Sequence, residues 1–335
     1  MSRTVFLGEL LVRLSAQGKQ LLATTPAFDV HIGGAEANVA VGMAMLGADT
    51  AMVSAVPDND LGRRAVAHLR SAGVDASGVR TAPGRMGLYL LTPGAGLRAS
   101  DILYDRADSA FARLGVGAFD WPALLAGATR LHLSGITPAL GPGSAALAVE
   151  AAEAATAAGV AISFDGNYRA RLWEAWDSDP RAILTRLVGT ATILFGNHQD
   201  IALLLGRAIP GEGEARRRAA AEAAFAAFPK LQLMASTARH ALDADRHAIS
   251  ARIDSREGAH QTDEALVSGI VDRIGAGDAF AAGVLAALDR GLAVAEAAEW
   301  GLALTALKHS LPGDASLFRP SDIAAFRSGA RDIRR

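Results

Sequence analysis

A chain of 335 residues is long enough to bury a sizeable core, in one large α/β domain or in two ordinary domains. Because 33 Lys and Arg residues stand against 35 Asp and Glu residues, the formal charge is −2, and the basic excess typical of proteins that bind nucleic acid or anionic membranes is missing. The absence of cysteine excludes disulfides, thiolate metal sites and cysteine nucleophiles, and no apolar run is long enough to cross a membrane. We therefore expect a cytoplasmic protein with a small-molecule partner, and neither nucleic acid nor membrane as partner.

Two kinds of segment alternate through most of the chain. Short runs rich in Val, Ile, Leu and Phe are followed by longer, Ala-rich segments of helical period. This alternation predicts an α/β fold in which helices cover a mainly parallel sheet. The expected strands are residues 4–8, 50–54, 130–134, 159–165, 191–196 and 230–236. The expected helices lie near 36–47, 59–72, 143–158, 180–189, 198–206, 212–228, 277–290, 293–310 and 320–330.

Two segments break the alternation, at about 9–32 and 85–112. Each carries short strand-like pieces separated by turn residues. The pieces are Leu10–Leu14, Ala27–Ile32, Gly87–Thr92 and Asp101–Tyr104. Together they predict a small β appendage inserted into the α/β domain.

A glycine pair precedes the first expected helix. Gly33 and Gly34 are followed by Ala35-Glu36-Ala37-Asn38 and then by an apolar helical run. Glycines at the start of a helix permit the close approach of a ligand, and Asn38 can hydrogen-bond it from the first turns. Simple helix capping explains the same residues, so this motif alone leaves both interpretations open.

The strongest chemical signal is the segment Asp272-Arg273-Ile274-Gly275-Ala276-Gly277-Asp278, which precedes an apolar helical run. Glycines before a helix let backbone N–H groups converge on an anion, and the helix dipole adds its positive end. Asp278 in the first turn can accept a proton from a substrate hydroxyl while those N–H groups stabilise a phosphoryl group in transfer. A bare Gly-x-Gly-Asp also caps helices, but the longer pattern that begins at Asp272 is rarer.

These motifs together resemble the ribokinase (PfkB) family of carbohydrate kinases over essentially the whole chain. The resemblance rests on the Gly-Gly-x-x-x-Asn start, Asp58-Asn59-Asp60-Leu61-Gly62, Asn197–Asp200 and the Gly-Ala-Gly-Asp segment, in the family's order and spacing. It implies a single ribokinase-like, doubly wound α/β domain over residues 1–335, with a β-sheet lid formed by about 9–32 and 85–112. It also implies ATP as donor, Mg²⁺ as cofactor and a homo-oligomer that forms through the lid.

Within this family the chain most resembles the kinases of 2-keto-3-deoxygluconate. The match rests on Gly8-Glu9, Gly87-Leu88-Tyr89, Tyr104-Asp105-Arg106 and Asp165-Gly166-Asn167-Tyr168-Arg169-Ala170-Arg171-Leu172-Trp173. It implies transfer of the ATP γ-phosphate to the 6-hydroxyl of this sugar acid, with Asp278 as base beside Gly275, Ala276 and Gly277. The substrate residues that it implies are Gly34, Asn38, Tyr89, Tyr104, Arg106 and Arg169, with Arg13 near the lid as a further candidate.

The residue types suit a 2-keto acid, which presents a carboxylate that a neutral sugar lacks. The guanidinium forks of Arg106 and Arg169 are suited to bind that carboxylate. Tyr89 and Tyr104 supply hydroxyls and flat faces for the carbon chain. Three alternatives stay open: the galactonate epimer, a neutral sugar or nucleoside such as fructose or ribose, and a degenerate member that binds ligand without catalysis.

The donor side departs from the family pattern at two places. The usual Asn-x-x-Glu reads Asn197-His198-Gln199-Asp200, so Mg²⁺ is expected to meet Asp200 through a water. The usual glycine-rich stretch reads Ala235-Ser236-Thr237-Ala238-Arg239-His240. The nucleotide residues that the resemblance implies are Asn167, Asn197, Ser236, Thr237, Arg239, Gly275 and Gly277. It also implies a monovalent cation such as K⁺ at Asp272.

Overall fold

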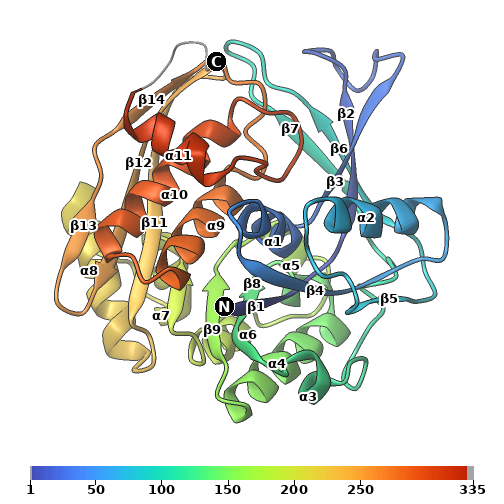
Figure 1. Cartoon of the computed structure of the whole chain (residues 1–335), viewed down its shortest axis with the longest axis horizontal. Coiled ribbons are helices and arrows are strands. Elements are labelled where there is room, and N and C mark those ends of the chain that lie inside the picture. Colours follow the sequence, from blue (N-terminus) through green and yellow to red (C-terminus); the bar gives the residue numbers. More distant parts are fainter. Residues whose placement is uncertain (1, 330–335) are drawn as a thin grey trace.

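A ten-stranded sheet forms the centre of the fold in a computed structural model that describes residues 2–329 (Figure 1). Its strands lie in the order β13-β12-β11-β10-β9-β8-β1-β4-β5, and β14 pairs with β12. The row from β11 to β5 is parallel, whereas β12, β13 and β14 join it by antiparallel pairing. The bounds are β1 Arg3–Leu7, β4 Asp49–Val56, β5 Val79–Thr81, β8 Ala128–Ser134, β9 Ala161–Asp165, β10 Ile193–Phe195, β11 Leu233–Asp243, β12 Arg246–Ser255, β13 Ala259–Gln261 and β14 Ala265–Ser268.

Helices cover both faces of this sheet. On one face lie α1 Ala35–Met45, α2 Asp60–Ser71, α9 Ala276–Asp289, α10 Val294–Lys308 and α11 Pro320–Arg327. On the other lie α3 Trp121–Leu124, α4 Pro142–Ala157, α5 Ala170–Trp173, α6 Pro180–Val188, α7 His198–Leu205 and α8 Gly213–Ala227. The nine expected helices are therefore confirmed, and residue 330 of the last expectation lies outside the described residues.

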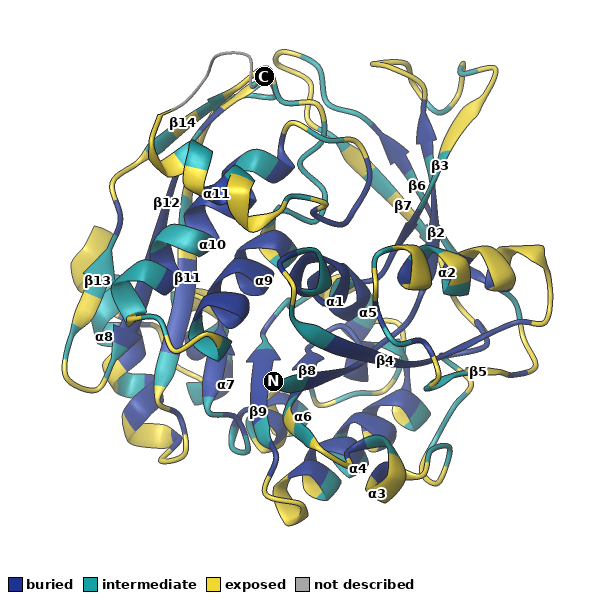
Figure 2. Cartoon of the chain, in the orientation of Figure 1, coloured by how far each residue is buried: buried dark blue, intermediate teal, exposed yellow. Residues whose placement is uncertain are grey.

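The central strands are apolar on both faces because each face is covered. On β1, the side chain of Phe6 belongs to one hydrophobic cluster, while Val5 and Leu7 belong to the other. Successive side chains of a strand point to opposite faces, so a strand buried on both sides reads as a continuous apolar run. Figure 2 shows the buried centre in dark blue and the exposed residues along α2 and at the loop tips in yellow.

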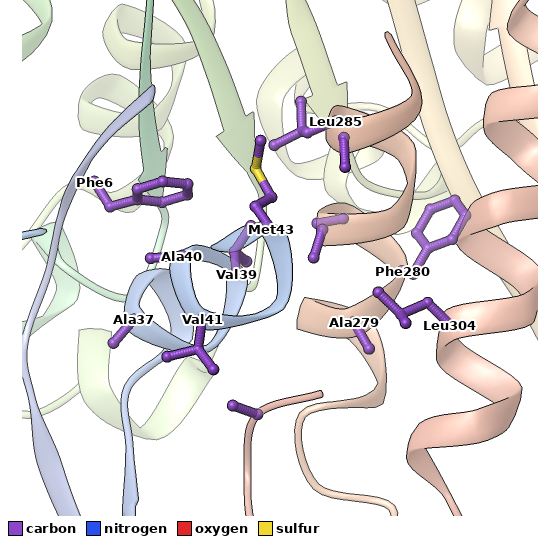
Figure 3. Close-up of a cluster of buried hydrophobic side chains, with 14 of the residues drawn as sticks. Phe6, Ala37, Val39, Ala40, Val41, Met43, Ala279, Phe280, Leu285 and Leu304 are labelled. Atoms are coloured by element: carbon purple, nitrogen blue, oxygen red, sulfur yellow. The ribbon is translucent and has the colours of Figure 1, made fainter. Parts of the chain in front are cut away.

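Close packing of α1, α9 and α10 sets the position of the N-terminus of α9. Figure 3 shows side chains of these helices and Phe6 of β1 in one cluster. Glycines permit the contact: a Cβ on Gly42 would lie 2.7 Å from Ala282, and one on Gly283 would lie 2.7 Å from the Trp300 carbonyl oxygen. Since interiors are close-packed, α9 has little freedom to shift along its axis. Its first turn, which carries Asp278, is therefore held at a fixed place above the sheet.

A second, four-stranded sheet lies to one side of the main sheet (Figure 1). Its order is β3-β2-β6-β7, with β2 and β6 parallel and the outer pairs antiparallel. The bounds are β2 Leu11–Ala16, β3 Phe28–Gly33, β6 Gly87–Thr92 and β7 Asp101–Asp105. We call this sheet the lid. The predicted fold class, a mainly parallel α/β sheet with a small β lid, is confirmed.

The sequence analysis did not predict the antiparallel part of the main sheet. It predicted one strand there, at residues 230–236. The strand β11 continues to Asp243 and turns into the ten-residue β12. Charged residues hide the apolar pattern of β12, since Arg252 and Asp254 are buried and satisfy each other, with Nε and Oδ2 2.7 Å apart. The short elements β5, α3 and α5 also escaped it. Within residues 2–329, no helix has the length and apolar character needed to cross a membrane.

Candidate active site

Two adjoining cavities lie beside the N-terminus of α9. The acceptor cavity, as we name it, has a volume of about 510 Å³, and the donor cavity has about 570 Å³. Both are lined by Asp165, Asn167, Arg169 and Gly277. The acceptor cavity is further lined by Leu11, Gly34, Ala35, Asn38, Tyr89, Ile102, Tyr104, Arg106, Ile136, Arg239, Arg273, Ile274, Gly275, Ala276, Asp278 and Asp314. The donor cavity is further lined by Tyr168, Phe195, Gly196, Asn197, Gln199, Asp200, Leu203, Ala235, Ser236, Thr237 and Phe280.

The carboxyl group of Asp278 lies in the acceptor cavity, in the first turn of α9. Its Oδ2 accepts a hydrogen bond from Nδ2 of Asn38 at 2.7 Å. Burial raises the pKa of Asp278 to about 7, and the charges of Asp314 and Glu36 act in the same direction, against the Asn38 hydrogen bond and Arg169. A group whose pKa lies near the working pH is suited to general base catalysis.

Gly275 shapes the backbone that begins α9. It has φ +77°, in the left-handed region that favours glycine, and a Cβ there would lie 1.6 Å from the carbonyl oxygen of Asp314. No other residue fits this position without moving the loop that carries Asp314. Gly275, Ala276 and Gly277, at the start of the 14-residue α9, line the acceptor cavity, where the positive end of the helix dipole lies. This is a suitable place for phosphate oxygens.

A buried network of charges joins the lid to this loop. The guanidinium of Arg13 on β2 places Nη2 2.5 Å from Oδ2 of Asp272 and Nε 3.2 Å from Oδ1 of Asp314. Tyr89 on β6 donates its hydroxyl hydrogen to Oδ2 of Asp314. Arg13 is 1% exposed. The lid strands β2 and β6 are thus tied to the segments that flank Gly275.

The two arginines predicted to bind a carboxylate have different surroundings. Arg106 is buried, and its Nε and Nη2 both donate to Oε2 of Glu9, at 2.8 Å for Nε. Its guanidinium also stands over the Tyr104 ring, 5.7 Å from the centroid. Arg169 is exposed and lines both cavities, and within residues 2–329 its guanidinium forms no ion pair, only a hydrogen bond to the Tyr168 carbonyl oxygen. Of the two, Arg169 is the one without an ion pair, and its charge opposes the rise in pKa of Asp165, Asp200 and Asp278.

Asn197 and Asp200 form a capping box at the N-terminus of α7. The Asn197 side chain accepts from the Gln199 N–H at 2.7 Å, and Oδ2 of Asp200 accepts from the Asn197 N–H at 2.7 Å. Burial nevertheless raises the pKa of Asp200, and it raises that of Asp165 to about 8, with the charges of Asp278 and Asp200 adding to the effect. The motif Asn-x-x-Asp therefore shapes a helix start and also places a carboxyl group in the donor cavity.

Most predicted site residues lie together, and three do not lie where expected, one of which is Gly275, predicted for the nucleotide but lining only the acceptor cavity. All six predicted substrate residues line the acceptor cavity, and Asn167, Asn197, Ser236, Thr237, Asp200 and Gly277 line the donor cavity. Arg239, predicted for the nucleotide, lines the acceptor cavity instead. Asp272 lines neither cavity, and its carboxylate forms an ion pair with Arg13. The monovalent cation at Asp272 stays a prediction.

Several residues of the site escaped the sequence analysis as functional positions. They are Glu9, Glu36, Asp165, Arg273 and Asp314. Glu9, Asp165 and Arg273 stand inside motifs that the sequence analysis quoted, so their neighbourhood was a usable signal. Asp314 follows a Pro-Gly turn late in the chain, and only the fold brings it to Gly275.

The fold and the two adjoining cavities are those of a phosphotransferase that acts on a small hydroxyl compound. Residues 1–320 match the model of the pfkB family of carbohydrate kinases. The chain therefore belongs to that family and is a carbohydrate kinase.

Individual relatives agree with this assignment. The chain is 31% identical over 325 residues to 2-dehydro-3-deoxygalactonokinase of Haloferax volcanii, which covers 95% of this chain and 94% of that protein. It is 31% identical over 320 residues to 2-dehydro-3-deoxygluconokinase of Thermoproteus tenax, and the match covers 94% of this chain and 90% of that protein. The crystal structure of 2-dehydro-3-deoxygluconokinase from Thermotoga maritima is similar, with a TM-score of 0.92 at 34% identity and 98% and 100% of the two chains covered.

Proposed function

We propose that this kinase transfers the γ-phosphate of ATP to the 6-hydroxyl of 2-keto-3-deoxygluconate. One observation carries the proposal: the acceptor cavity holds Asp278, with a pKa of about 7, together with the guanidinium of Arg169, which forms no ion pair within residues 2–329. The first group is suited to take a proton from a hydroxyl, and the second to bind a carboxylate. The names of the relatives from Thermoproteus tenax and Thermotoga maritima support the gluconate acid, and that of the Haloferax volcanii relative supports its galactonate epimer.

In the proposed reaction, the carboxylate of Asp278 removes the proton of the acceptor hydroxyl. The hydrogen bond from Asn38 holds that carboxylate in place. The N–H groups of Gly275, Ala276 and Gly277 stabilise charge that develops on the phosphoryl group. Gly277 lines both cavities, so the phosphoryl group passes beside it.

The acceptor is proposed to lie between the main sheet and the lid. Arg169 binds its carboxylate, while Arg106, Tyr89 and Tyr104 contribute N–H groups, hydroxyls and flat faces. Gly34 brings backbone close to it, since a Cβ there would lie 2.2 Å from the Glu9 carbonyl oxygen. The ties from the lid to the Gly275 loop support a closed position of the lid that keeps water out.

The donor is proposed to bind in the cavity lined by Asn167, Asn197, Ser236 and Thr237. Within residues 2–329 no group of three His, Cys, Asp or Glu side chains could hold a metal ion. This arrangement suits Mg²⁺, which keeps most of its waters and binds through few carboxylates plus substrate phosphates. Asp200 and Asp165 would hold it through water, and the ion would supply positive charge to the phosphate oxygens.

The proposal is tested by an ADP-release assay across a panel of acceptors. The panel contains 2-keto-3-deoxygluconate, its galactonate epimer, fructose, ribose and a nucleoside, each with Mg-ATP. The kcat/KM for one of the sugar acids should exceed that for every neutral acceptor. A neutral sugar as the best acceptor would overturn the proposal, and the absence of ADP release with every acceptor would favour a non-catalytic member.

Changing Arg169 to Ala should raise the KM for the sugar acid roughly 10–100-fold, because charge-assisted hydrogen bonds are each worth about 1.5–3 kcal/mol. The matched control is Arg171→Ala, since Arg171 is exposed and lines neither cavity. Steady-state kinetics with sugar acid and with a neutral hexose separate the effects. An equal rise of KM for both acceptors would contradict carboxylate binding by Arg169.

The kcat/KM should fall as the pH drops through about 7, because Asp278 must be ionised to act as a base and burial raises its pKa to that value. The Asn38 hydrogen bond lowers this pKa, so Asn38→Ala should move the acid limb to higher pH. Asn59→Ala, which removes an asparagine outside both cavities, is the control. A limb that stays in place or moves to lower pH in Asn38→Ala would count against the assignment.

A kinase of a neutral sugar is the second candidate, and one observation favours it. Glu9 neutralises Arg106, so one of the two guanidiniums predicted for a carboxylate is already paired. Under this alternative, Arg169→Ala leaves the KM of the best acceptor nearly unchanged. The acceptor panel and this variant together decide between the two.

A further inference from the structure

We propose that Arg239 and Arg273 act as a pair that binds the phosphoryl group while it moves from donor to acceptor. Both line the acceptor cavity. Within residues 2–329, neither guanidinium forms an ion pair or a hydrogen bond with the protein. Of the other arginines beside this site, Arg106 pairs with Glu9 and Arg13 with Asp272 and Asp314, whereas Arg169 is the proposed carboxylate ligand.

The two guanidiniums lie close enough to repel each other. Partial desolvation lowers the pKa of Arg239, and the charge of Arg273 lowers it further. Like charges that meet without a carboxylate between them raise the free energy of the empty protein. An anion bound between them would remove that cost, and guanidinium forks match the oxygens of a phosphoryl group.

The chain positions both residues on the wall of the acceptor cavity, which the start of α9 also lines. Arg273 stands two residues before Gly275, so the backbone holds it beside the N–H groups that begin α9. Arg239 stands two residues after Thr237 on β11, and side chains two apart on a strand share one face, about 7 Å from each other. Since Thr237 lines the donor cavity and Arg239 the acceptor cavity, β11 leads from one to the other. In the proposed transfer, a phosphoryl group that enters the acceptor cavity beside Gly277 comes within reach of both guanidiniums.

The role is stabilisation of charge, and it rests on ATP as the proposed donor. The acceptor hydroxyl gives its proton to Asp278, its oxygen forms a bond to the γ-phosphorus, and the bond to the bridging oxygen breaks, leaving the electron pair on ADP. In the transition state, negative charge is spread over the three equatorial oxygens. Guanidiniums that meet those oxygens lower the barrier and leave the affinity for either substrate nearly unchanged.

The test compares Arg239→Met and Arg273→Met with Arg169→Met, each measured for acceptor-dependent transfer and for slow hydrolysis of ATP without acceptor. We expect each of the first two to lower kcat for both reactions by roughly 10²–10³-fold, the range seen on loss of one transition-state donor, with little change in either KM. Arg169→Met should instead raise the KM for the sugar acid, because it removes the group proposed to bind the acceptor carboxylate. His240→Ala is the control on β11, because His240 is exposed and lines neither cavity. Arg239→Lys and Arg273→Lys should recover part of kcat.

A second measurement does not need turnover. ADP with aluminium fluoride, which mimics the phosphoryl group in transfer, should bind more weakly to both methionine variants in calorimetry, whereas ADP alone should bind as before. Three results would overturn the proposal. A rise only in the acceptor KM would mean that the pair binds the acceptor, and a loss of affinity for ADP alone would mean that it binds the nucleotide before transfer. Unchanged kinetic and binding constants would mean that both side chains are merely solvated. If no sugar acid is phosphorylated while ADP with aluminium fluoride still discriminates, the proposed acceptor fails and this inference stands.

Discussion

Replacement of Asp278 by Asn should lower kcat by roughly 10²–10⁴-fold, the usual contribution of a positioned general base. Asparagine has nearly the same shape but cannot accept the proton of the acceptor hydroxyl. The side chain lies in the first turn of α9, whose residues 279–287 are buried, so the helix itself should remain in place. Steady-state kinetics at pH 8 give the comparison, because the wild-type carboxyl, with a pKa of about 7, is then mostly ionised.

Two further results make this comparison decisive. The KM values for donor and acceptor should stay within a few-fold of those of the wild type, since the change removes the proton acceptor and leaves the groups that bind the substrates. Replacement of another first-turn acid, Asp60→Asn in α2, should leave kcat unchanged, because Asp60 lines neither cavity. Near-normal turnover of Asp278→Asn would exclude Asp278 as the base.

Replacement of Arg13 by Met should lower the free energy of unfolding by about 3–5 kcal/mol, the range observed when one partner of a buried ion pair is removed. The change would leave two buried carboxylates, Asp272 and Asp314, without their cation. Burial already raises the pKa of Asp314, and Arg13 opposes that rise. The midpoint of urea denaturation, followed by circular dichroism, measures the loss.

The control for this prediction is Arg63→Met on α2. Arg63 also pairs with two aspartates, Asp58 and Asp60, but its side chain is 64% exposed. Exposed ion pairs contribute about 0–1 kcal/mol, so the loss there should be small. If Arg13→Met costs no more than Arg63→Met, the network that joins the lid to the Gly275 loop does not hold the fold together.

The residue types near Gly275 could be interpreted from the sequence because their roles are local. A glycine in the left-handed region, the N–H groups of a helix start and an acid in its first turn all lie within four consecutive residues. The alternation of apolar strands and Ala-rich helices predicted the parallel part of the sheet for the same reason, since each element carries its own periodicity. The lid strands were found through the turn residues that separate them.

Ion pairs between residues far apart in the chain could not be predicted from such local patterns. Arg106 looked like a free guanidinium, yet Glu9, 97 residues away in the chain, neutralises it. The partners of Arg13 are separated from it by 259 residues in one case and lie after α10 in the other. The antiparallel strand β12 was missed because its buried charges satisfy each other and so break the apolar pattern.

The sequence by itself determined the glycine turn that begins α9, the acid in its first turn, and the family to which these motifs belong, because each depends on neighbours along the chain. Only the tertiary structure decided which charges are compensated and which remain available for a ligand. It joined residues from the lid, β9, β11 and α9 into two cavities, and it left Arg169, Arg239 and Arg273 without an ion pair among the described residues. The physical reason is that an ion pair depends on distance in space, which the order of residues does not record.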